Sequence, residues 1–98
     1  MFAIAFELVV ADAAKHHPRG VAAAYDDIST ALQRFGFERI QGSVYVSDNN
    51  DMANLFAALP ALQALPWLAR VVRDIRGFRL ENWSDFTPLV KGAAPTKS

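Results

Sequence analysis

The stretch FAIAFELVV, residues 2–10, constrains the fold most, because its period of two predicts a strand that is apolar on both faces. One face carries the large side chains of Phe2, Ile4, Phe6, Leu8 and Val10. The other face carries Ala3, Ala5, Glu7 and Val9. A strand with one face in water would alternate apolar and polar residues. We therefore expect helices to cover the large face and a partner subunit to cover the small one.

The composition fits one small domain that has apolar residues to spare. The chain has 98 residues, of which 52% are hydrophobic and 20% charged. This composition argues against disorder. Because a small domain leaves much of its surface exposed, surplus apolar residues often form an oligomer interface. We expect a homodimer in which residues 1–91 form a single domain and residues 92–98 a flexible tail.

Other totals exclude several classes of protein. The absence of cysteine excludes disulfide scaffolds, cysteine-ligated zinc and cysteine catalysis. The first ten residues lack the basic start of a signal peptide, and no apolar run approaches the ~20 residues of a membrane span. We expect a cytoplasmic protein with no membrane partner. Its formal net charge is zero, so nucleic-acid binding would require a local basic patch.

Two apolar stripes with helical spacing predict two helices. The first stripe lies between Pro18 and Gly36 and comprises Val21, Tyr25, Ile28, Leu32 and Phe35. The second follows the candidate capping residues SDNND and comprises Met52, Leu55, Phe56, Leu59, Leu62 and Leu65. We expect Pro60 to kink the second helix and Pro66 to end it.

Three further segments have the composition of strands. We predict strands at residues 37–40 and 43–47, joined at Gln41–Gly42, and another over residues 72–83. Gly77 is a candidate bulge position in the last strand, and Ser84 a candidate cap for a short helix through Leu89. We expect residues 11–17 to form a polar connection in which His16 and His17 are solvated.

The resulting order of elements is the βαββαβ pattern of a ferredoxin-like α+β fold, an antiparallel sheet with both helices on one face. The opposite face would be open, and we expect it to carry Ala3, Ala5, Glu7, Ser43 and Tyr45. Small apolar residues there favour close approach of a second sheet, so we predict that the dimer forms through this face.

Glu7 is the main candidate for chemistry, and two interpretations stay open. It is either a solvated or arginine-paired residue at a strand end, or a carboxylate that faces its symmetry mate across the dimer. Such a pair would bind Mg²⁺ through oxygen ligands or share a proton in acid–base catalysis. Gln41 and Ser43 are candidates for contacting a phosphate or ordering a water nearby, although they also fit an ordinary polar turn.

Arginines recur every third residue at positions 70, 73, 76 and 79. Each alone is best explained by a salt bridge with Asp74 or Glu81. Together they form a candidate basic patch for RNA, and we name Arg73, Arg76, Arg79 and Tyr45 as candidate substrate-binding residues.

Three blocks of sequence resemble the virulence-associated protein D family over residues 2–91. They are FAIAFELVV, GFERIQGSVYV (36–46) and VRDIRGFRLENWSDFT (72–87). The family is similar to a small CRISPR-associated nuclease that forms a ferredoxin-like dimer and uses Mg²⁺. The resemblance implies a homodimeric, virulence-linked endoribonuclease, often paired with an antitoxin. It places the catalytic acid at Glu7, and it places the polar residues that follow the second strand at Gln41, Gly42 and Ser43.

One residue departs from the family pattern. Where the family usually has aspartate, this chain has Glu7, whose oxygens lie about 1 Å or more further out, and a displacement of that size can cost ~10²-fold in rate. The expected function is an endoribonuclease. The alternative is a non-catalytic RNA-binding or scaffolding dimer in which Glu7 stabilises the interface. No motif supports a small-molecule site.

Overall fold

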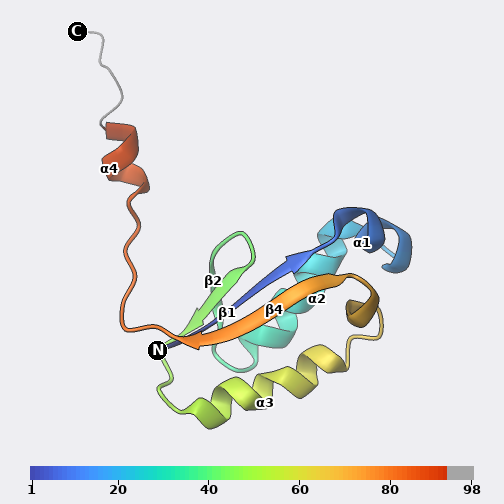
Figure 1. Ribbon diagram of the computed structural model, residues 1–98, viewed down its shortest axis with the longest axis horizontal. Coiled ribbons are helices and arrows are strands. Elements are labelled where there is room, and N and C mark those ends of the chain that lie inside the picture. Colours follow the sequence, from blue (N-terminus) through green and yellow to red (C-terminus); the bar gives the residue numbers. More distant parts are fainter. Residues whose placement is uncertain (93–98) are drawn as a thin grey trace, which may run out of the picture.

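A computed structural model describes residues 1–92 as a four-stranded antiparallel sheet with helices packed on one face (Figure 1). The strands are β1 (Phe2–Leu8), β2 (Glu38–Gln41), β3 (Val44–Ser47) and β4 (Val72–Arg79). Their order in the sheet is β2-β3-β1-β4. This order is consistent with the expected ferredoxin-like fold, and the α+β class is confirmed.

The helices are α1 (Val10–His16), α2 (Val21–Gln33), α3 (Met52–Gln63) and α4 (Thr87–Gly92), with a 3₁₀ turn η1 (Leu68–Arg70) before β4. The predicted helices α2 and α3 are confirmed, although each ends about two residues early. The connection predicted at residues 11–17 is wrong, because most of it is the helix α1. In the described part of the chain, no helix is long and apolar enough to cross a membrane.

The core lies between the sheet and the two long helices. The large side chains of β1 are buried there, as predicted, and they pack with Ile28 and Leu32 of α2 and with Leu55 and Leu62 of α3. The cap of α3 is Asp51, whose side chain accepts a hydrogen bond from the Ala53 amide at 2.9 Å. Pro60 lies within α3 without ending it.

The predicted bulge lies elsewhere in β4. Gly77 pairs regularly with Ile4, whereas Arg73 is the extra residue between the pairs Glu7–Asp74 and Leu8–Val72. A Cβ atom at Gly77 would lie 3.3 Å from both terminal methyls of Leu55. The glycine therefore permits close packing of α3 on β4.

A C-terminal arm, residues 80–92, follows β4 and carries α4 away from the sheet and the long helices (Figure 1). The strand ends at Arg79, short of the predicted residue 83, and α4 has no buried residue. Asp85, rather than the predicted Ser84, accepts a hydrogen bond from the Thr87 amide at the start of α4. The flexible tail predicted at residues 92–98 lies outside the described residues, apart from Gly92.

Candidate active site

Glu7 lies near the end of β1, on the sheet face that the helices leave open, as predicted. Its side chain is 59% exposed. Asp74 of β4 lies directly across the strand pair, and side chains opposed in this way have Cβ atoms about 4.5–5.5 Å apart. The structure thus places a second carboxylate beside Glu7. The alternation within β4 does not reveal this pairing, because it depends on the register with β1.

The bulge in β4 brings an arginine to the same place. Arg73 is the unpaired residue of the bulge, so its side chain does not have to follow the alternation between the two faces of the sheet. Its Nε atom lies 3.7 Å from Oε2 of Glu7, and both side chains are largely exposed. An exposed pair of this kind contributes only about 0–1 kcal/mol to stability. The pair therefore leaves a guanidinium accessible to an anion.

The other two candidate arginines diverge. Arg76 lies opposite Ala5 on the open face, and its Nη2 atom is 3.9 Å from Oδ2 of Asp74. Arg79 lies opposite Phe2 at the other end of β4, with its guanidinium carbon 5.4 Å from the centre of the Phe2 ring. The structure therefore places Arg73 and Arg76 near Glu7, but not Arg79.

The turn between β2 and β3 reaches the residue next to Glu7. Ser43 accepts a hydrogen bond from the Phe6 amide through its backbone carbonyl at 3.1 Å. Gln41 pairs with Val44, which pairs with Ala5, so Gln41 lies on the open face. Ser43 instead lines a hollow beside α2. The expectation that Ser43 shares the face of Glu7 is wrong, and the catalytic roles of Gln41 and Ser43 stay predictions.

Tyr45 also lies on the wrong side for the predicted role. It pairs with Ile4, and its ring stacks on Phe6 with 5.9 Å between ring centres. The residue is 1% exposed and belongs to the core. Its predicted position on the open face is wrong, because the side chain points to the core side of the sheet.

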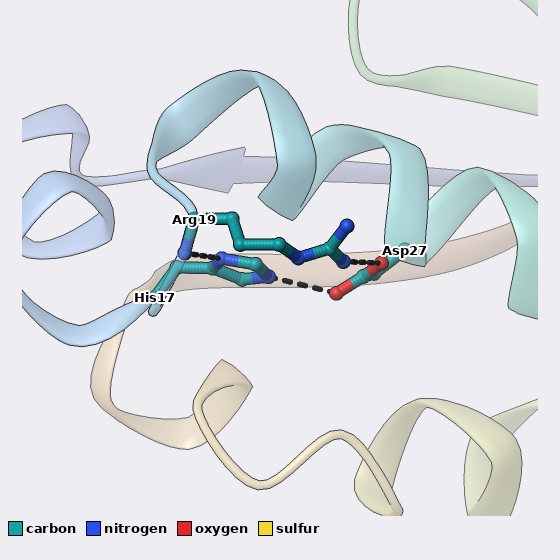
Figure 2. Close-up of polar contacts among 3 residues, drawn as sticks. All are labelled: His17, Arg19 and Asp27. Atoms are coloured by element: carbon teal, nitrogen blue, oxygen red, sulfur yellow. Dashed lines mark hydrogen bonds and ion pairs between the residues drawn. The ribbon is translucent and has the colours of Figure 1, made fainter.

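A second polar cluster joins the end of α1 to α2 (Figure 2). His17, predicted to be solvated, is 4% exposed and packs edge-on against Trp67. Its Nε2 atom lies 2.7 Å from Oδ2 of Asp27. Its Nδ1 atom accepts a hydrogen bond from the Arg19 amide at 3.0 Å, and Arg19 Nη2 donates to Oδ1 of Asp27 at 3.2 Å. The sequence alone does not reveal this cluster, because the burial of His17 depends on Trp67, which is distant in the chain.

The contacts of His17 assign it a structural role. Because Nδ1 accepts the Arg19 N–H, the proton of the neutral ring is on Nε2 and is donated to Asp27. Both ring nitrogens are then engaged, and neither is free to take a proton from a substrate. The hydrogen bond from His17, together with the positive charge of Arg19, lowers the pKa of Asp27 below its usual range.

Relatives of known name match almost the whole chain, although no protein-family model matches it. "Endoribonuclease VapD homolog" of Neisseria gonorrhoeae is 62% identical over 91 residues, which is 93% of this chain and 99% of the relative. "Endoribonuclease VapD" of Haemophilus influenzae is 56% identical over 93% of this chain and 99% of the relative. The Dichelobacter nodosus protein of that name is 46% identical over 95% of this chain and 100% of the relative. The chain belongs to the VapD endoribonuclease family.

The open face is the part of this VapD-family chain that fits a divalent cation. Glu7 and Asp74 supply carboxylate oxygens from neighbouring strands, and Mg²⁺ is commonly bound by one or two carboxylates together with water and substrate phosphate. Within residues 1–92, no three or more His, Cys, Asp or Glu side chains form a metal-binding group. Glu7 and Asp74 are therefore the residues that could hold such an ion, with water and phosphate supplying the other ligands.

Proposed function

We propose that this VapD-family chain cleaves RNA phosphodiester bonds at a centre formed by Glu7, Asp74, Arg73 and Arg76. The observation that supports this centre is the pairing of Glu7 with Asp74 beside two guanidinium groups on one exposed face. Carboxylates accept protons, and guanidinium groups bind phosphate through two parallel hydrogen bonds. The face thus combines a base with a phosphate-binding site.

In the proposed reaction, Arg73 and Arg76 hold the scissile phosphate and stabilise the charge that develops on it. Glu7 accepts the proton of the attacking group, which is either water or the RNA 2′-hydroxyl. The new P–O bond forms as the bond to the departing sugar oxygen breaks, and that oxygen takes up a proton. A magnesium ion held by Glu7 and Asp74 would polarise the phosphate and lower the pKa of a bound water.

Gln41 is proposed to assist from the β2–β3 turn. Its position on the open face suits a hydrogen bond from its amide to a phosphate oxygen. The hydroxyl of Ser43 would form its hydrogen bond to the RNA on the other side of the turn, where Ser43 lines the hollow beside α2. Gln41 thus shares the face of the carboxylate, whereas Ser43 does not.

The proposal includes a ferredoxin-like homodimer that acts in the cytoplasm. The strand order and the open face of β1 are what this assembly requires. Exposed apolar side chains add support, namely Phe78 on β4 and Trp83, Phe86, Leu89 and Val90 on the C-terminal arm. An antitoxin is a further proposed partner, and covering Arg73 and Arg76 would be its simplest mode of inhibition.

Cleavage of a single-stranded RNA by the purified chain tests the proposal. We expect cleavage by the wild type and a loss of about 10²-fold or more for Glu7→Gln, because the base is removed. Glu7→Asp should retain activity, because the carboxylate base is kept. Parallel reactions with Mg²⁺ or with EDTA show whether the carboxylate pair requires the ion.

Glu38→Gln is the matched control, because Glu38 is an exposed carboxylate on β2 that pairs with Val46, away from Glu7. We expect this variant to cleave like the wild type. If the wild type cleaves no faster than Glu7→Gln, the catalytic proposal fails. Retained RNA binding would then favour the non-catalytic module.

A further inference from the structure

The hollow beside α2 lies on the opposite side of the β2–β3 turn from Gln41. It has a volume of about 370 Å³ and is lined by Ala22, Tyr25, Asp26, Ser29, Arg39, Gly42, Ser43 and Tyr45. This volume is within the range of about 300–1,000 Å³ that is usual for small-molecule sites. The helix residues of the lining are spaced three or four apart, so they form one flank of α2. Tyr25 lies where this flank meets the core face.

Arg39 is held in place at the rim of this hollow. Its Nε atom donates a hydrogen bond to the carbonyl oxygen of Gly42 at 2.9 Å. Gly42 has a φ of +41°, a backbone conformation that favours glycine, so the turn that carries this carbonyl is specified by the sequence. Arg39 forms no ion pair within residues 1–92. The terminal nitrogens of its guanidinium thus remain available to a ligand.

Asp26 supplies the opposite chemistry in the same hollow. Its carboxylate is exposed and, in the described residues, is not part of any ion pair, unlike the neighbouring Asp27. Tyr25 adds a half-buried aromatic ring whose centre lies 6.2 Å from that of Phe6. A ligand that fits would have hydrogen-bond donors for the carboxylate, acceptors for the guanidinium and a flat ring for the tyrosine.

We propose that this hollow binds an unpaired guanine base of the RNA, next to the phosphate that is cleaved. Guanine offers O6 and N7 as acceptors, which arginine contacts through two hydrogen bonds. It also offers N1–H and the N2 amino group, which match the two oxygens of a carboxylate. Single-stranded RNA exposes these edges and stacks its bases on aromatic side chains.

The position of the hollow connects it to the proposed catalytic face. Ser43 lines the hollow and holds the Phe6 amide through its carbonyl, and Phe6 is the neighbour of Glu7. An RNA strand that passes over the β2–β3 turn would contact Gln41 on one side and Ser43 on the other. This inference rests on the proposed function for the identity of its ligand, but its binding test does not require cleavage.

Fluorescence anisotropy with short RNAs tests the assignment. The Glu7→Gln variant, which should not cleave, is titrated with the pentaribonucleotides UUGUU, UUAUU, UUCUU and UUUUU. We expect UUGUU to bind about tenfold more tightly than the others, which corresponds to one paired set of base contacts. Adding Asp26→Asn or Arg39→Lys should abolish most of this preference. Glu38→Gln, added in the same background, should leave it intact.

The outcomes separate the two proposals. Equal binding of the four RNAs, a preference for another base, or a guanine preference that survives Asp26→Asn would overturn the guanine site. Thermal melting of each variant shows whether a loss of preference reflects unfolding. If a variant is destabilised, the test is instead made on the Glu7→Gln chain by NMR. There, adding UUGUU should shift the signals of Tyr25, and adding UUUUU should not. Selective binding by a chain that does not cleave would support this site while the nuclease proposal fails.

Discussion

The contact between the buried His17 and the partly buried Asp27 has a consequence for how stability depends on pH. The pKa of Asp27 is lowered by the hydrogen bond from His17 and by Arg19. A carboxyl whose pKa is lower in the folded state stabilises that state above its unfolded pKa of about 3.9. The stabilisation is lost as the pH falls through the lowered folded value. We expect Asp27→Asn to be less stable than the wild type at pH 6, with a difference that narrows towards pH 2–3.

Urea unfolding measured at several pH values checks this prediction. Asp26→Asn is the control, because Asp26 is the neighbouring carboxylate on α2 and lacks an ion pair in the described residues. It should show little difference from the wild type at any pH. A difference for Asp27→Asn that stays constant from pH 6 to pH 2 would contradict the linkage.

At the scale of single residues, the sequence predicted the face of Glu7 but not the faces of Ser43 and Tyr45. The alternation predicts that Val44 and Val46 share one face of β3 and that Ser43 and Tyr45 lie on the other, open face. In the structure Tyr45, Val46 and Ser47 are all buried, so polarity does not distinguish the two faces of this strand. Which face joins the core is decided by pairing of Tyr45 with Ile4, a contact between distant segments.

Among the elements, the packing of α3 on β4 depends on a missing side chain. A Cβ atom at Gly77 would already crowd the methyl groups of Leu55 at 3.3 Å. A valine there would add two methyl groups to a filled space, and overpacking of this kind typically costs about 1–3 kcal/mol. We expect Gly77→Val to lower the free energy of unfolding by about that amount, as measured by urea denaturation.

Two comparisons test the cause of that loss. Arg76→Val introduces the same residue on the open face of β4, where the side chain is exposed, and it should change stability by less than about 0.5 kcal/mol. In the Leu55→Ala background, Gly77→Val should cost less than in the wild type, because the space has been emptied. Equal costs in both backgrounds would show that Leu55 is not the obstacle.

The elements themselves differ in how far local sequence determines them. The helices α2 and α3 can be predicted from their apolar stripes, because the spacing of apolar residues within one helix is visible in the local sequence. The helix α1 was missed because only Ala13 of its residues is buried, so no stripe marks it. The bulge at Arg73 was placed at Gly77 because a glycine is a local signal, whereas the bulge arises from the register between β1 and β4.

In the whole molecule, the C-terminal arm is the described segment that ends in a helix with no buried residue. Four large apolar side chains are exposed on it, including Phe86 at 64% and Leu89 at 71%, and exposed apolar groups gathered in this way mark interaction surfaces. If the arm contacts a second copy, removing it should dissociate the proposed dimer without unfolding the domain. We expect a chain that ends at Leu80 to sediment as a monomer and still unfold cooperatively in urea.

A milder variant shows whether the apolar side chains of the arm, rather than its backbone, hold the two copies together. Replacing Phe86 and Leu89 with serine keeps the arm but removes apolar surface, and it should weaken the dimer at least tenfold by sedimentation. A chain that ends at Gly92 is the control and should remain dimeric, since it keeps every residue of the arm. If both shortened chains sediment as dimers, the contact must lie on the open sheet face alone, where Phe78 and Ala5 would carry it.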